Sequence, residues 1–290
     1  ISQYIDALSE CEVIFSSWGM PLLDRSLLEK LPHLSFVFYA AGSTRYFTTD
    51  AMWDRGVRVC SAWRANAIPV ADYTVGAVLM SLKRVWHYAS EMKRAGKYTE
   101  PHDIPGTYGT TVGIVSLGVI GRMVCERLAR YDMKVLVYDP FVADDDVRSL
   151  EVERASLEDL FTQSDVISIH TPLLDETVHM IGGELLSRMK SHATFINTSR
   201  GAVVDERALI EVLFRRPDLY ALLDVTEEEP LPSSSPLYSL PNAILTPHIA
   251  GSLGPERLRL GKFMADEFIR WHEGKPLLHE VTRDMASRMV

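Results

Sequence analysis

The chain has 290 residues, enough for two domains that each bury a core, and its 39 acidic and 30 basic residues give a formal net charge of -9. This charge argues against nucleic acid or an anionic membrane as a partner, so any anionic ligand must be held locally. Three widely spaced cysteines without a C-x-x-C pair argue against a disulfide framework and a zinc site, and they indicate a cytoplasmic protein.

Strands and helices alternate along most of the chain, which predicts parallel sheets with helices on their faces. The chain opens on Ile1 within a helix-like segment, Ile1 to Leu8, so we expect an N-terminal piece to be absent from this sequence; no signal peptide is recognisable. The first block of expected elements contains strands at Glu12 to Phe15, Ser35 to Ala40 and Val57 to Cys60, and helices near Asp24 to Leu31 and Thr49 to Arg55.

The segment from Pro69 to about Arg94 has a helical, apolar pattern and is long enough to connect two lobes. Its best apolar run, Ile68 to Leu82, contains Pro69 and Asp72 and falls short of the ~20 uninterrupted residues that a membrane span needs. We therefore expect no membrane partner.

The second block repeats a strand-helix cycle six times, which is the strand count of a doubly wound nucleotide-binding domain. Ser156-x-x-Asp159 resembles a capping box, Glu227 to Pro241 is expected to be an irregular loop, and a last helix is expected from Pro255 to about His272. This organisation divides the chain into residues 68–250 and residues 1–67 completed by 251–290. The expected strands are Val112 to Val115, Lys134 to Tyr138, Val166 to Ile169, Thr194 to Asn197, Tyr220 to Leu223 and Ala243 to Leu245.

The first strand of this block leads into VSLGVIGR, where the frame of a G-x-G-x-x-G fingerprint falls on Ser116, Gly118 and Gly121. Gly118 stands where the backbone approaches a diphosphate, and Gly121 where helix and strand pack closely. Ser116 occupies the tight-turn position, which a residue with a Cβ can fill if its φ is negative, so we expect a negative φ for this serine. An ordinary strand-to-helix turn explains this stretch about equally well.

A helix that opens at Val119 and Ile120 presents free N–H groups and a partial positive charge to a diphosphate, and Arg122 adds further donors. Asp139 ends the next strand, where an acid binds the ribose hydroxyls and repels a 2'-phosphate. The alternative for Asp139 is an ordinary loop acid before Pro140. The order of strand, turn, helix, strand and acid favours a dinucleotide, and NAD over NADP.

Three later segments follow strand ends, where open α/β sheets bind ligands: INTSRGAVVD with Arg200, LLDVTEEEP with Asp224 and Glu229, and LTPHIAGS with His248. Taken singly, each has an ordinary explanation as a solvated arginine, one acid in a surface run, or a loop histidine. Their shared location favours a common site.

With these motifs the sequence closely resembles the D-isomer-specific 2-hydroxyacid dehydrogenases. VGIVSLGVIGR, YDP, HTPL, NTSRGAVVDERAL, TPHIAGS, AAGSTRYF and NAIPVADYT all match, so the resemblance covers nearly the whole chain. It implies an α/β fold, with a doubly wound Rossmann domain and a smaller flavodoxin-like substrate lobe. It also implies an NAD-dependent enzyme whose catalytic residues are Arg200, Glu229 and His248.

The chemistry explains these residue types. Reduction of a 2-oxo acid needs a hydride, a proton for the oxygen and a fixed carboxylate. Arg200 can clamp the carboxylate and polarise the ketone with one planar fork. His248, of a residue type whose ordinary pKa is ~6.5, can donate the proton in reduction and accept it in oxidation. A neighbouring Glu229 carboxylate would favour the imidazolium.

The resemblance also implies weaker assignments. Asp224 would bind the nicotinamide carboxamide, and Thr171 with the Thr198-Ser199 backbone would line the cofactor cleft. Gly42 and Ser43 would offer N–H groups to the substrate carboxylate, and Trp18 and Arg45 would shape the pocket, although packing and surface charge explain the last two equally well. Two positions depart from the family pattern: Ser116 replaces a glycine, and Asp72 stands where glutamate is common.

These observations favour a homodimeric NAD(H)-dependent dehydrogenase of a small 2-oxo acid such as glyoxylate or hydroxypyruvate, with the long helix from Pro69 as the dimer contact. A rival from another class is an NAD-sensing corepressor, which has the same fold, retains the same three residues and binds peptides. A methyl transferase with a similar glycine-rich turn is a second rival, but it leaves the later motifs unexplained.

Overall fold

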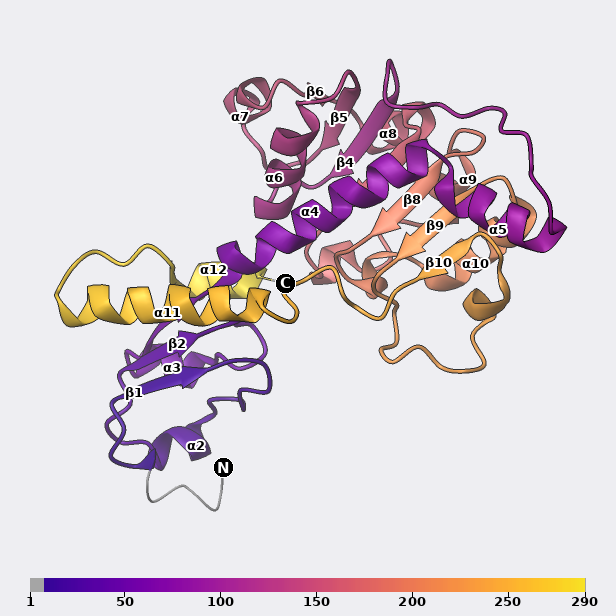
Figure 1. Ribbon diagram of the computed structural model, residues 1–290. Helices are drawn as coiled ribbons and strands as arrows, with labels where there is room; N and C mark the ends of the chain where they lie inside the picture. Colours follow the sequence, from indigo (N-terminus) through magenta and orange to yellow (C-terminus); the bar gives the residue numbers. More distant parts are fainter. Residues whose placement is uncertain (1–7, 290) are drawn as a thin grey trace. The chain divides into compact units, whose positions relative to one another are not determined.

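The structure, a computed structural model, describes residues 8–289 and is shown in Figure 1. The expected helix-like segment Ile1 to Leu8 lies outside the described residues except for Leu8. The chain forms two compact units, the larger of which is continuous from Ile68 to Gly251, while the smaller combines residues up to Ala67 with those from Ser252 onward.

The larger unit is built on a seven-stranded, fully parallel sheet with strand order β10-β9-β8-β7-β4-β5-β6. The strands run outward in both directions from β4, so the order reverses between β4 and β7, which is where doubly wound sheets bind ligands. The strands are β4 (Thr111–Val115), β5 (Lys134–Tyr138), β6 (Glu153–Arg154), β7 (Val166–Ile169), β8 (Thr194–Asn197), β9 (Tyr220–Leu223) and β10 (Ala243–Leu245).

Helices cover both faces of this sheet (Figure 1). Apolar residues of α4, α6 and α7 form one core with β4 and β5, and those of α8, α9 and α10 form a second core on the opposite face. The central strands β7 and β8 are buried along their whole length, as expected for parallel strands covered on both sides. The helices are α4 (Trp63–Leu82), α5 (Val85–Ala95), α6 (Val119–Leu128), α7 (Asp144–Ser149), α8 (Leu157–Gln163), α9 (Gly183–Ser187) and α10 (Glu206–Arg215).

All six strands expected in this block are present, and β6 was missed because two exposed, charged residues carry no apolar pattern. The hydroxyl of Ser156 accepts the N–H of Asp159 at 3.0 Å and caps α8 as expected. The expected loop from Glu227 to Pro241 is irregular apart from one 3-10 turn, η4 (Pro236–Ser239). Two further 3-10 turns are η2 (Asp175–Thr177) and η3 (Gly201–Val203).

Helix α4 differs from the sequence expectation because it continues through Pro69 and reaches 20 residues. It is the one helix among the described residues that is long and apolar enough to cross a membrane by length and composition. A core helix passes the same test, and 56% of its apolar window is buried inside the protein, so the test is weak evidence for a membrane span. The helical pattern expected from Pro69 to Arg94 is divided by Arg84, whose φ of 51° lies in the left-handed region.

The smaller unit has a four-stranded sheet of order β1-β2-β3-β11, in which β11 is antiparallel to β3. Apolar residues of α2 and α3 pack on one face, and α11 covers the aromatic side chains of Phe36 and Phe38 on the other. Strand β11 and helix α12 were not expected from the sequence. The elements are β1 (Val13–Ser16), α2 (Arg25–Glu29), β2 (Phe36–Tyr39), α3 (Asp50–Asp54), β3 (Arg58–Ser61), α11 (Glu256–His272), β11 (Glu280–Val281) and α12 (Arg283–Arg288).

A buried carboxylate joins β11 to this unit. Glu267 of α11 is 1% exposed, and its Oε2 accepts the N–H groups of Leu278 at 2.9 Å and His279 at 3.0 Å. The thiol of Cys60 donates to the same oxygen at 3.5 Å, and burial raises the pKa of this thiol. Cys60 is therefore a structural thiol with little thiolate character.

Candidate active site

The turn between β4 and α6 contains the glycine-rich motif, and its first residue is a serine. Ser116 has a φ of 75°, in the left-handed region, so the negative φ expected from its side chain is wrong. Its N–H donates to the carbonyl of Tyr138 at 2.8 Å, which continues the β4-β5 ladder into the turn. The tight connection therefore imposes a backbone conformation that glycine adopts without cost.

The two glycines of the turn serve different purposes. A Cβ on Gly121 would lie 2.1 Å from the carbonyl oxygen of Ser116, so only glycine lets the helix pack against the turn. A Cβ on Gly118 would meet nothing within 4 Å, which leaves open space at the start of α6. No side chain caps this helix, and its first N–H groups, including those of Val119 and Ile120, lack intrahelical acceptors. This arrangement suits a diphosphate.

We expect Ser116→Gly to raise the free energy of unfolding by about 1 kcal/mol, because a left-handed residue with a Cβ costs about 1–2 kcal/mol and glycine removes that cost. Part of the gain is offset by the greater freedom of glycine in the unfolded chain. Urea denaturation measures the change. Ser116→Ala keeps the Cβ and loses only the hydroxyl, so an equal gain in this variant would contradict the explanation.

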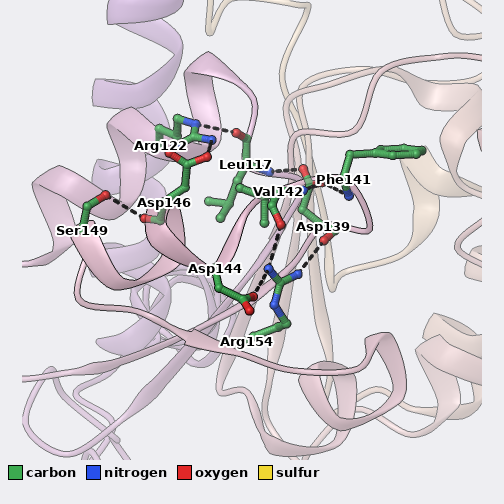
Figure 2. A network of polar contacts seen from close by, with 9 residues as sticks. All are labelled: Leu117, Arg122, Asp139, Phe141, Val142, Asp144, Asp146, Ser149 and Arg154. Atoms are coloured by element: carbon green, nitrogen blue, oxygen red, sulfur yellow. Dashed lines mark hydrogen bonds and ion pairs between the residues drawn. The ribbon is translucent and has the colours of Figure 1, made fainter.

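Asp139 lies beside this turn and holds its backbone (Figure 2). One carboxylate oxygen accepts the N–H of Leu117 at 2.8 Å, and the other accepts those of Phe141 at 2.8 Å and Val142 at 3.1 Å. The oxygen that accepts only Leu117 keeps a second lone pair, so Asp139 can still accept one ribose hydroxyl there. The residue expected to bind the ribose therefore also stabilises the backbone of the turn.

Two arginines hold the segments around Asp139 (Figure 2). Arg154 of β6 donates to the carbonyl oxygens of Asp139 at 3.0 Å and Val142 at 2.7 Å, which fixes the loop after β5. Arg122 donates through Nε to the carbonyl of Leu117 at 2.9 Å and through a terminal nitrogen to Asp146 at 2.9 Å. Because these two guanidinium nitrogens of Arg122 already bond to the protein, one terminal nitrogen is left for a ligand.

The end of β7 adjoins the same turn, because the N–H of His170 donates to the carbonyl of Val115 at 2.8 Å. Thr171 is 3% exposed, and its buried hydroxyl has no hydrogen-bond partner among residues 8–289. His170 is also buried, and Nε2 lies 3.1 Å from the hydroxyl of Ser168. An unpaired buried hydroxyl beside an open helix start fits a polar cofactor lying across the turn.

Burial lowers the pKa of His170 to about 3, so the folded protein keeps this imidazole neutral while the unfolded chain protonates it near its ordinary pKa of ~6.5. The stability that this histidine contributes is present above pH ~6.5 and falls by up to about 1.4 kcal/mol per pH unit as the pH drops toward 3. The free energy of unfolding, measured by urea denaturation from pH 7 to 4, should fall less steeply in His170→Gln than in the wild type. The exposed His33→Gln serves as control; parallel curves for His170→Gln and the wild type would contradict the prediction.

Arg200 follows β8 and is half-buried. One terminal nitrogen donates to the carbonyl of Ser199 at 2.6 Å, and its remaining N–H groups have no acceptor among the described residues. Burial lowers the pKa of Arg200 and the Glu229 carboxylate opposes this, but a guanidinium stays charged at neutral pH. The structure therefore presents a charged, largely uncommitted fork of donors.

Glu229 and His248 form a hydrogen-bonded pair in the site. The Oε2 of Glu229 lies 2.8 Å from Nδ1 of His248, and its Oε1 accepts the N–H of Thr226 at 3.3 Å. Both side chains are about half exposed, and the φ of His248 is 53°, in the left-handed region. Because Nδ1 is engaged, Nε2 is the ring nitrogen that remains for a substrate.

Asp224, at the end of β9, is buried and organises the segment that carries His248. Its Oδ1 accepts the hydroxyl of Thr246 at 2.6 Å and the N–H of Ile249 at 2.8 Å, and its Oδ2 accepts the N–H of Ala250 at 2.8 Å. The sequence suggested a nicotinamide contact for Asp224. The structure shows that it also has a positioning role, which leaves mainly Oδ2 for a ligand.

Sequence reasoning missed Gly201, which brings the arginine turn against the loop that carries Glu229. A Cβ on Gly201 would lie 1.9 Å from the carbonyl carbon of Thr226 and 2.0 Å from its oxygen. The glycine directly after Arg200 in the motif was the available signal, but its contact is with a segment about 25 residues away. Thr198 is also buried, and its hydroxyl lies 3.3 Å from that of Thr74 on α4.

A hollow of about 570 Å³ adjoins the Glu229 and His248 pair within the larger unit. Leu231, Tyr238 and Leu245 contribute apolar surface to it. Arg200 is not among its lining residues, so this hollow lies beside the arginine rather than around it.

The remaining predicted residues lie in the smaller unit. Trp18 follows β1, and Gly42, Ser43 and Arg45 lie in the loop after β2. The N–H groups of Gly42 and Ser43 have no acceptor among the described residues, while the carbonyl of Gly42 accepts the hydroxyl of Ser61 at 2.5 Å. Trp18 is 52% exposed and carries the guanidinium of Arg257 over its ring at 5.7 Å. Arg45 is exposed. The neighbouring backbone N–H groups of Gly42 and Ser43 suit a carboxylate.

Comparisons with known proteins identify relatives of this chain. The model of the family described as D-isomer specific 2-hydroxyacid dehydrogenase, NAD binding domain, matches residues 75–250. A glyoxylate reductase of Korarchaeum cryptofilum is 35% identical over 277 residues, which cover 93% of this chain and 82% of the relative. An (S)-sulfolactate dehydrogenase of Chromohalobacter salexigens is 36% identical over 253 residues, covering 86% and 81%.

Solved structures show the same fold. The D-mandelate dehydrogenase of Rhodotorula graminis matches with a TM-score of 0.81 at 26% identity, covering 97% of this chain and 88% of its own. The α/β fold class expected from the sequence is thereby confirmed. The chain belongs to the D-isomer-specific 2-hydroxyacid dehydrogenases, as an NAD-dependent oxidoreductase in which the family's NAD-binding domain matches residues 75–250.

Proposed function

We propose that the enzyme reduces a small 2-oxo acid, glyoxylate or hydroxypyruvate, to its 2-hydroxy acid with NADH. The observation that carries this proposal is the 2.8 Å contact between Glu229 and His248 in the same domain as the uncommitted guanidinium of Arg200. The glyoxylate reductase among the relatives supports the substrate class. The sulfolactate dehydrogenase relative makes a 2-oxo acid with an anionic substituent a competing choice.

In this reaction Arg200 binds the substrate carboxylate and polarises the ketone. His248 donates a proton from Nε2 to the carbonyl oxygen and accepts it in the oxidative direction. Glu229 holds the imidazole through Nδ1. Asp224 fixes the segment that carries this histidine.

The residues present fit NAD. The start of α6 with Val119 and Ile120 would hold the diphosphate, Asp139 the ribose hydroxyls, and Thr171 the adjoining part of the cofactor. Thr198 and Ser199 would line the cleft at the nicotinamide end. The bound cofactor supplies the hydride.

The test is the consumption of NADH with a panel of 2-oxo acids: glyoxylate, hydroxypyruvate, pyruvate, 3-sulfopyruvate and 3-phosphohydroxypyruvate. We expect the highest kcat/KM with glyoxylate or hydroxypyruvate, and NADH to be preferred over NADPH because Asp139 repels a 2'-phosphate. A preference of ten-fold or more for one of the other acids would overturn the substrate assignment.

We also propose that the enzyme is a homodimer whose contact lies along α4 and α5. Helix α4 is apolar around its circumference, yet Met80 is 40% exposed, and none of the residues of α5 is buried. Exposed Tyr98 and Tyr108 follow α5 in the chain. Sedimentation equilibrium measures the mass; a monomer at micromolar concentration would contradict the proposal.

A further inference from the structure

A buried asparagine ends β8, three residues before Arg200. Asn197 is 1% exposed, and its side chain makes three hydrogen bonds, all of them to the two residues that lead into and include the arginine. Oδ1 accepts the N–H and the hydroxyl of Ser199, each at 2.9 Å, and Nδ2 donates to the carbonyl of Arg200 at 3.0 Å.

No regular secondary structure fixes this turn. The sheet ladder of β8 ends at Asn197, and η3 begins at Gly201, so Arg200 lies between them with extended φ and ψ of -141° and 143°. The guanidinium of Arg200 is itself anchored on the carbonyl of Ser199 at 2.6 Å. Asn197 therefore holds the two peptide groups on either side of the one on which the arginine side chain rests.

We propose that Asn197 is a positioning residue that sets the direction in which Arg200 presents its guanidinium to the substrate carboxylate. This inference rests on the proposed role of Arg200. Asn197 acts through the backbone and the Ser199 carbonyl, since its own polar atoms are all engaged by the turn.

The isosteric Asn197→Asp change isolates this role. The carboxylate keeps an acceptor for Ser199 but replaces the Nδ2 donor with an oxygen, which then lies against the carbonyl of Arg200. Two acceptors in a buried contact repel each other, so the turn shifts. A displacement of about 1 Å at a substrate clamp costs about 100-fold in rate.

The experiment measures KM for glyoxylate and the Kd of oxamate, an unreactive 2-oxo acid analogue, for the enzyme with NADH bound. We expect Asn197→Asp to raise both by about 10- to 100-fold. NADH affinity, measured by fluorescence, should change by less than oxamate affinity. Asn197→Ser also loses the bond to the carbonyl of Arg200 without adding a charge, and it should shift oxamate binding in the same direction if the aspartate variant fails to fold.

Asn242 offers a matched control in the same domain. It is 2% exposed, and its amide nitrogen donates to the carbonyls of Leu213 at 3.1 Å and Leu219 at 2.9 Å. Asn242→Asp therefore makes the same buried change away from the arginine turn. It should lower Tm and leave oxamate binding unchanged.

The outcomes separate the two proposals. A wild-type enzyme that neither reduces the tested 2-oxo acids nor binds oxamate would overturn the proposed function. An active wild type whose oxamate affinity is unchanged in Asn197→Asp and Asn197→Ser, or changed equally in Asn242→Asp, would overturn the positioning role alone.

Discussion

Replacement of Arg200 by alanine should lower kcat/KM for the 2-oxo acid by about 10³-fold or more. Loss of a single preorganised donor to a developing oxyanion costs about 10²–10³-fold, and this guanidinium is expected to serve both the ketone oxygen and the carboxylate. Burial of the side chain adds to the effect, because charge interactions are stronger away from water. The measurement is steady-state oxidation of NADH with glyoxylate and hydroxypyruvate.

Arg200→Lys is the matched variant. It keeps the charge but not the planar pair of donors, so we expect a loss between those of the wild type and the alanine variant. NADH affinity should change little in both variants. Turnover by Arg200→Ala equal to that of the wild type would remove the assigned role.

Gly201→Ala should reduce both stability and turnover. The added Cβ would lie 1.9 Å from the carbonyl carbon of Thr226, and neither backbone can move aside by a simple rotation. Thr226 donates its N–H to Glu229, so a displaced loop carries this carboxylate away from His248. We expect an activity loss of about 100-fold, the scale of a 1 Å misplacement, and a lower Tm.

Gly182→Ala is the control, because a Cβ at that position meets nothing within 4 Å and the backbone has a φ of -97°. It lies in the same unit and should leave both quantities near the wild type. A Gly201→Ala enzyme with normal turnover would show that the close approach of the two loops is unimportant for catalysis.

Much of the fold follows from local sequence pattern. The six expected strands of the larger unit are buried apolar runs between turn signals, so their positions are readable from composition. Strands β6 and β11 have two residues each and exist because a neighbouring strand offers a free edge. Pro69 did not end α4, since packing of the helix against the core outweighed the local signal.

The site divides in the same way. Arg200, Glu229 and His248 stand in recognisable motifs. The last two are 19 residues apart, and their contact depends on the largely irregular loop from Glu227 to Pro241, whose path no pattern encodes. The positive φ of Ser116 comes from the geometry of the turn rather than from the residue type.

The discontinuity of the smaller unit constrains the order of events during synthesis. During synthesis, β3 cannot pair with β11 until the ribosome has made the residues from Ser252 onward. For the same reason, α11 cannot yet cover the aromatic face of Phe36 and Phe38. The continuous larger unit is finished first. A nascent chain therefore carries an uncovered aromatic sheet face until α11 has been made, and exposed apolar surface of this kind favours aggregation during synthesis.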